Sequence, residues 1–109
     1  RIVFDAEYSD AARDLRAGDE LFVLTWLHRA DREVRRVHPR GDPGNPLTGV
    51  FATRSPDRPN PVGLHRVTVT EVVPANGQGE DGVCLLVRDL EAIDGTPVID
   101  VKPVLPGGR

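Results

Sequence analysis

The sequence predicts a mainly β fold, in which a single antiparallel sheet forms a small barrel accompanied by one short helix. Two observations carry this prediction. Apolar, β-branched segments recur between turns rich in Pro and Gly. Consecutive segments also lack the long helical crossovers that a parallel sheet would require. Closing the sheet into a barrel hides its edges. With 109 residues the chain fits one domain, which we expect to extend over residues 1–109.

In the first half of the chain, the sequence predicts one helix and two strands. Residues 8–20 combine polar N-cap candidates, a weak apolar stripe and a terminal glycine, which is typical of a short helix. Residues 20–28 are a continuous apolar run and predict a buried strand. Residues 29–48 are polar and rich in Pro and Gly. We therefore expect a long functional or mobile loop there, before a second strand at residues 49–53.

The second half begins with a segment that cannot pair as a strand and continues with three strands. Residues 54–63 contain three prolines, which lack the N–H that a ladder needs. Residues 64–74 alternate between apolar and polar side chains, with Val67 and Val69 on the apolar face. The remaining expected elements are a hairpin loop at residues 75–82, a strand at 83–90, a turn at 91–97 and a last strand at 98–105.

Composition and motif spacing argue against several functional classes. No apolar run approaches the roughly 20 residues of a membrane span, so we expect no membrane association. The single cysteine, Cys84, excludes an internal disulfide and is expected to be a core residue. With no signal-peptide pattern, this favours a cytoplasmic protein. The spacing of the three histidines matches no standard zinc pattern, so we expect no metal.

Charge is segregated along the chain. The net charge is −3, yet residues 28–66 hold eight arginines against four acidic residues, and all three histidines. Such a segment can present a positive face to an anion although the total charge is negative. The alternative is a solvated, arginine-rich loop.

The stretch FATRSPDRPNPVGLH, residues 51–65, carries two of these arginines on a stiff frame. Its prolines fix the backbone, so little conformational entropy remains to be lost on binding. Arg54 and Arg58 can each meet a carboxylate or phosphate with two parallel hydrogen bonds. Asn60 lies between two prolines and is aimed in a fixed direction. The alternative is a rigid structural loop whose arginines form surface ion pairs.

A second stretch, DLEAIDGTPVIDVKP, contains a tight Asp94-Gly95 turn followed by a strand. Asp100 and Lys102 are two residues apart and therefore share one face of that strand. Asp94 can simply cap its turn, and the other two can form an exposed structural pair.

The two segments GVFATRSPDRPNPVGLHRVTV and LEAIDGTPVIDVKP, with the upstream FVLTWLHRAD, resemble the TsaA-like family, also called TrmO or YaeB-like. The resemblance covers nearly the whole chain. It implies a small β-barrel that acts as a homodimer and as an S-adenosylmethionine-dependent methyltransferase. The implied substrate is tRNA, methylated on N6 of threonylcarbamoyladenosine next to the anticodon. It also implies a further strand upstream of residue 1.

The resemblance further implies a pocket for S-adenosylmethionine. Arg54 suits the cofactor's carboxylate, acidic and backbone groups of residues 89–95 suit its ribose diol or cationic end, and apolar side chains can face adenine. We therefore expect the proline-rich corner and the Asp-Gly turn to share one cleft, within a subunit or between two. The residues implied are Leu27, His28, Arg54, Leu64, Asp89, Leu90, Glu91, Ala92 and Asp94.

For catalysis, in-line positioning of the reacting atoms and removal of the N6 proton are the expected contributions. The candidate bases are Asp100, His28 and His65. Arg58 and Asn60 can instead hold the substrate's threonyl carboxylate or a phosphate, and the arginine-rich residues 29–40 suit salt-sensitive contacts with tRNA.

Two other functions remain open from the residues alone. One is a barrel module that binds S-adenosylmethionine or RNA without catalysis, and the other is a methyltransferase with a different acceptor.

Overall fold

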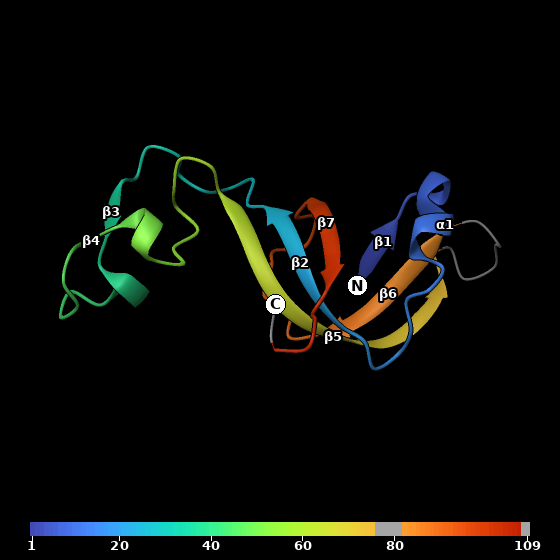
Figure 1. Ribbon diagram of the computed structural model, residues 1–109. Helices are drawn as coiled ribbons and strands as arrows, with labels where there is room; N and C mark the ends of the chain where they lie inside the picture. The colour runs from blue at the N-terminus through green and yellow to red at the C-terminus, as the bar shows by residue number, and fades with distance from the viewer. Residues whose placement is uncertain (76–81, 108–109) are drawn as a thin grey trace.

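The computed structural model, which describes residues 1–75 and 82–107, consists of a curled five-stranded sheet and an arm that projects from it (Figure 1). The strand order is β1-β6-β5-β2-β7, and every neighbouring pair is antiparallel. The strands are β1 (Ile2–Phe4), β2 (Glu20–Trp26), β5 (Val62–Pro74), β6 (Val83–Arg88) and β7 (Val98–Pro103). β1 and β7 are the two edge strands, so the curled sheet stays open between them and forms a half-barrel. The predicted mainly β fold is confirmed.

The hydrophobic core lies on the inner face of this curled sheet. Side chains of β2 alternate between the two faces, and Leu21 and Val23 are almost completely buried. Leu21 lies opposite Val67 of β5, and both Val67 and Val69 are buried as their alternation predicts. Burial of each such side chain contributes about 1.5–3 kcal/mol, so this face holds the strands together. Ile2 and Leu85 complete the core cluster.

The strand boundaries differ from the predicted ones by small amounts. β2, β6 and β7 end two residues earlier than expected, and β5 begins two residues earlier, at Val62. β1 was not predicted, because three apolar residues before an aspartate are too short a signal. The predicted hairpin loop falls mainly on residues 76–81, which lie outside the described residues.

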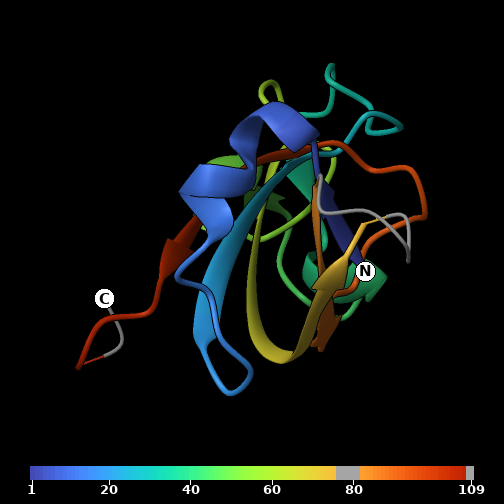
Figure 2. The same cartoon turned by 90° about the vertical axis from the view of Figure 1, so that its right-hand side faces the viewer.

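The predicted helix at residues 8–20 is much shorter in the structure. A 3-10 turn, η1 (Ala6–Tyr8), leads into the single α-helical turn α1 (Ser9–Ala12), at the end of the sheet away from the arm (Figures 1 and 2). Gly18 and Asp19, within the predicted helix, bond to β5 instead. The Gly18 N–H donates to the carbonyl of Val69 at 2.7 Å, and the Val69 N–H donates to the carbonyl of Asp19 at 2.8 Å. Because of these hydrogen bonds, residues 13–19 do not continue the helix.

Residues 29–60 form the arm, which contributes to the molecule's elongated shape of 50 × 30 × 18 Å. Its elements are β3 (Arg36–Val37), β4 (Thr48–Gly49) and the 3-10 turns η2 (Pro39–Gly41) and η3 (Val50–Ala52). The strand predicted at residues 49–53 is therefore wrong. Arg58 donates to the carbonyls of both Val50 and Thr53, so these two carbonyls point to the same side. In a strand, carbonyls three residues apart would point to opposite sides.

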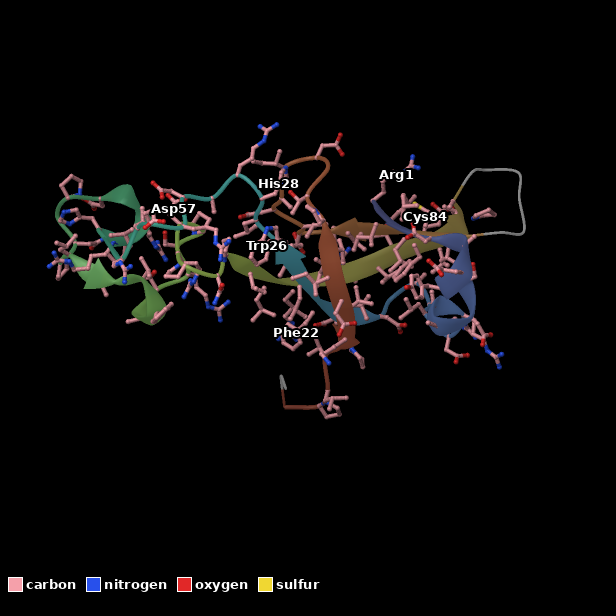
Figure 3. All side chains as sticks on the ribbon, turned by 90° about the horizontal axis from the view of Figure 1, so that it is seen from above. Arg1, Phe22, Trp26, His28, Asp57 and Cys84 are labelled. Carbon is pink, nitrogen blue, oxygen red and sulfur yellow. The ribbon has the colours of Figure 1, made fainter. Side chains whose placement is uncertain are left out.

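One side chain fastens the arm to the sheet. The Arg32 Nε donates to the carbonyl of Pro59 at 2.7 Å, and its Nη2 donates to Asn60 Oδ1 at 3.3 Å. The same guanidinium lies 5.4 Å from the ring centroid of Trp26, at the end of β2. Figure 3 shows Trp26 and His28 where arm and sheet meet, with Asp57 out on the arm.

Within residues 1–75 and 82–107, no three His, Cys, Asp or Glu side chains are grouped so that they could hold a metal ion. None of the helices in this part of the chain has the length and apolar character needed to cross a bilayer. Cys84 is a free, buried thiol in β6, as its apolar surroundings predict.

Candidate functional site

The first candidate site, which we call the sheet cleft, is a cavity of about 280 Å³ at one end of the inner face. The segment that follows β6 forms its wall, and Asp89, Leu90, Ala92 and Asp94 all line it, together with Thr25 of β2. These four wall residues are among those implied by the resemblance. Carboxylates beside apolar side chains suit a ligand that carries hydroxyl or cationic groups on an apolar ring system.

Backbone conformation shapes the wall of the sheet cleft. Asp89, directly after β6, has a φ of 71°, a left-handed conformation that aspartate tolerates better than most residues. Gly95 has a φ of 86°, and the Thr96 N–H donates to the carbonyl of Ile93 at 3.0 Å. The predicted Asp-Gly turn is thus confirmed, and it brings Asp94 to the cleft.

The second candidate site, the arm cleft, is a larger cavity of about 810 Å³. Arg40, Arg54 and His38 line it, with Thr53 and Asp57 nearby on its wall. In the part of the chain that the structure describes, neither Arg40 nor Arg54 makes a side-chain hydrogen bond or ion pair. Two unpaired guanidinium groups at one cavity favour an anionic ligand.

The third basic group of the arm cleft has a defined tautomer. His38 Nδ1 lies 2.8 Å from the carbonyl oxygen of Asn45. A carbonyl can only accept, so Nδ1 carries the proton and donates it. Sequence reasoning named neither His38 nor Arg40 as an individual site residue, but it assigned the arginine-rich residues 29–40, which include both, to contacts with tRNA.

Arg58 and Asn60, expected to hold the substrate, are engaged inside the arm. Arg58 donates to the carbonyls of Thr53, Ser55 and Val50 at 3.0, 3.1 and 3.0 Å, and its guanidinium lies 5.9 Å from the ring centroid of Phe51. The Asn60 side-chain oxygen accepts from Arg32. These contacts favour the alternative of a rigid structural loop, but with bonds to backbone carbonyls in place of surface ion pairs.

Two further predicted residues lie on the outer face of the sheet. Leu64 and Asp100 both lie opposite Leu24 in the strand register, so their side chains face away from the core. Leu64 is 47% exposed. Asp100 forms an ion pair with Lys102 at 3.5 Å, which confirms that these two share a face. Neither Leu64 nor Asp100 lines the sheet cleft of its own chain.

His65 lies on the inner face, beside a residue that sequence reasoning missed. Its Nε2 is 2.8 Å from Thr25 Oγ1, and Thr25 is only 1% exposed. Burial lowers the pKa of His65, whereas the charge of Glu91 raises it and partly opposes this effect. The usable signal for Thr25 was a polar residue inside an apolar strand.

Leu27 and His28 follow β2 at the junction with the arm. The Leu27 N–H donates to the carbonyl of Pro61 at 2.8 Å, which brings the two ends of the arm together. His28 is exposed. Within one chain, Arg54 and Asp94 line different clefts. A site that uses both is therefore not assembled inside a single chain.

The fold and the two clefts define a β half-barrel domain with one cleft at one end of its core and a second, cationic cleft on a projecting arm. The chain belongs to the tRNA-methyltransferase O N-terminal domain family, whose model matches residues 1–107.

Curated relatives agree with this assignment. A probable S-adenosyl-L-methionine-binding protein of Methanothermobacter thermautotrophicus is 50% identical over 97 residues, which are 89% of this chain and 63% of that protein. An S-adenosyl-L-methionine-binding protein of Archaeoglobus fulgidus is 41% identical over 104 residues, covering 95% of this chain and 67% of the relative. The tRNA (adenine(37)-N6)-methyltransferase of Escherichia coli is 43% identical over 100 residues, covering 90% and 41%. The chain thus spans less than two thirds of the Methanothermobacter thermautotrophicus protein and of the Escherichia coli protein.

Proposed function

We propose that this domain binds S-adenosylmethionine and methylates N6 of an adenine in tRNA, the acceptor being threonylcarbamoyladenosine next to the anticodon. The observation that carries the proposal is the sheet cleft, whose wall is built by the family-like segment from Asp89 to Asp94. The relatives named as S-adenosyl-L-methionine-binding proteins and as a tRNA methyltransferase support it. Such a role places the protein in the cytoplasm.

The residues of the sheet cleft fit the adenosyl part of this cofactor. Asp89 and Asp94 can accept hydrogen bonds from a ribose diol or face a cationic group, while Leu90 and Ala92 supply apolar surface for a base. Bound there, the cofactor supplies a methyl group on a sulfonium, which is a good leaving group. The chain's own contribution is orientation, with Asp100, His28 or His65 as the candidate base for the N6 proton.

The second half of the site comes from the arm. Arg54 is unpaired in the described residues and suits the cofactor's carboxylate, and Arg40 beside it suits a phosphate of the tRNA. Since Arg54 and Asp94 line separate clefts of one chain, we place the complete site between two copies, with the arm of one chain covering the sheet cleft of the other. Exposed apolar side chains on the sheet, among them Val62 and Leu64, suit such a homodimer.

Calorimetry with S-adenosylmethionine tests cofactor binding. We expect Arg54→Ala to weaken binding by about 1.5–3 kcal/mol, the usual contribution of a hydrogen bond to a charged group. Arg36→Ala is the matched control, because Arg36 belongs to the same arm but does not line the arm cleft. Wild-type affinity in Arg54→Ala would remove Arg54 from the site, and no heat with the wild-type protein would contradict cofactor binding altogether.

Mixing two variants tests the shared site. In the mixed dimer, one chain carries Arg54→Ala and the other carries Asp94→Asn. If each site takes Arg54 from one chain and Asp94 from the other, one of the two sites is intact. If each site takes both residues from the same chain, neither site is intact. We therefore expect the mixture to regain binding that each variant alone has lost. No recovery, or sedimentation as a monomer at tens of micromolar, would contradict the homodimer.

Methyl transfer is tested with tRNA that carries or lacks threonylcarbamoyladenosine, followed by mass spectrometry of the nucleosides. We expect a methylated product only from the modified tRNA. Transfer to the unmodified tRNA would indicate another acceptor, and cofactor binding with no transfer to either would indicate a binding module.

A further inference from the structure

Thr25 and His65 form a polar pair within an otherwise apolar inner face. Thr25 is the one polar side chain that is almost completely buried in the described ranges, and its hydroxyl lies 2.8 Å from His65 Nε2. The two residues come from adjacent strands, with Gly63 directly opposite Thr25. A Cβ atom at Gly63 would lie 2.7 Å from His65 Nε2 and still closer to Thr25 Oγ1. Because Gly63 has no side chain, there is room for the hydrogen bond between Thr25 and His65.

The pair lies directly behind the sheet cleft. Thr25 lines the cleft, whereas His65 does not. Glu91, whose charge acts on the His65 ring, belongs to the segment that forms the cleft wall. His65 is thus connected to the cleft twice, through the Thr25 hydroxyl on one side and through Glu91 on the other.

We propose that His65 is a positioning residue of the sheet cleft, whose neutral ring holds the Thr25 hydroxyl in the geometry that binds the ligand and leaves the wall at residues 89–96 undisturbed. Protonation of the ring weakens that binding. The identity of the ligand, S-adenosylmethionine, rests on the proposed function, but the coupling between His65 and the wall does not.

The physical basis is the reversal of one hydrogen bond. In this proposal the proton of the neutral ring lies on Nδ1, so that Nε2, 2.8 Å from Thr25 Oγ1, accepts from the Thr25 hydroxyl. A protonated ring has only donors, so the hydroxyl must turn and accept instead. Because Nε2 is already bonded to Thr25, His65 does not present this nitrogen to a reacting atom. This role removes His65 from the candidate bases and leaves Asp100 and His28 among them.

Protonation also places a positive charge beside the cleft. Glu91 is the charged group that acts on His65, and Arg1, Asp89 and Asp94 line the cleft itself. The neighbours of the ring on the strands, Thr25 and Gly63, are uncharged. A charged ring therefore attracts Glu91, pulls on the wall and repels a cationic ligand. Burial lowers the pKa of His65 below the ordinary value of 6.5, so the ring is neutral at pH 7.

Nuclear magnetic resonance of the protein without ligand provides the first test. We expect the backbone amide signals of residues 89–96 to shift with the same midpoint as the His65 ring. These shifts should disappear in His65→Gln, which keeps a hydrogen-bonding group but does not titrate in this range. Amide shifts that persist in His65→Gln, or wall amides that do not follow the ring, would overturn the proposal.

Calorimetry with S-adenosylmethionine at neutral pH and at a pH below the midpoint measured for the His65 ring provides the second test. We expect the wild-type Kd to rise about fivefold at the lower pH, the low end of usual coupling between sites. His65→Gln should show no such rise, Thr25→Ser should retain it, and Thr25→Val should retain only the part that is due to the charge of the ring. An equal rise in His65→Gln would contradict the proposal. If the wild-type protein binds no S-adenosylmethionine at either pH, the proposed function fails, and the measurement without ligand still decides the role of His65.

Discussion

Arg32 stacks on Trp26 where the arm meets the sheet, with the guanidinium carbon 5.4 Å from the centre of the indole. The same guanidinium donates to the carbonyl of Pro59 at 2.7 Å. Trp26 is the last residue of β2, and Pro59 lies just before β5. One side chain thus connects the point where the chain leaves the sheet with the point where it returns.

Arg32→Ala should therefore loosen the arm without unfolding the sheet. The loss of an exposed cation–π contact is worth about 0.5–1 kcal/mol, and the lost hydrogen bonds add to it. Hydrogen exchange should become faster at arm amides such as those of Val50 and Thr53, and remain unchanged in β2 and β5. Arg36→Ala should leave the arm as protected as in the wild type. Equal exchange in the two variants would contradict the bracing role of Arg32.

Arg58→Ala should loosen the 3-10 turn at Val50–Ala52, because three carbonyls lose a charged donor at once. We expect a loss of about 1.5–3 kcal/mol in the stability of the arm, as for hydrogen bonds to a charged group. Arg58→Lys should recover little, since an ammonium cannot reproduce the planar fork. Arg54→Ala, in the same segment, should unfold like the wild type in urea. If Arg54→Ala were the more destabilised variant, the structural role would belong to Arg54 instead.

Gly63→Ala should destabilise the whole domain by about 1–3 kcal/mol, the usual effect of overpacking. The added methyl group would overlap the Thr25–His65 pair on the inner face. Gly49→Ala is the matched control, because nothing lies within 4 Å of a Cβ atom built there. Urea denaturation compares the two. Similar midpoints for both variants would show that the space around Gly63 is not restricted.

The stability of the domain should fall as the pH falls below the ordinary imidazole value of 6.5. Burial lowers the pKa of His65 in the folded state, so the unfolded chain binds more protons between the two pKa values. The contribution of His65 to the free energy of unfolding therefore rises with pH across this window and is lost in acid. The difference between wild-type protein and His65→Gln, measured by urea denaturation from pH 5 to 8, isolates this contribution. A difference that does not change with pH would contradict it.

Much of the sheet could be predicted because its signals are local. The apolar run of β2 and the alternation of β5 specify strands over a few residues, and the Asp-Gly turn before β7 has a strong local preference. β1 was missed because three residues carry too little pattern, and its strand conformation depends on pairing with β6. The helix at residues 8–20 was overestimated because hydrogen bonds to Val69, distant in sequence, compete with it.

The sequence by itself determined the fold class, the family and the segments that carry polar and basic side chains. Only the tertiary structure decided which of these side chains meet. It placed Arg54 and Asp94 at different clefts and engaged Arg58 in hydrogen bonds within the arm. It also placed Thr25 in the lining of the sheet cleft, next to His65. The physical reason is that strand propensity and turn preference act between near neighbours in the chain. Which side chains share a cleft depends on strand register and on the path of a long arm, which are set by contacts between distant residues.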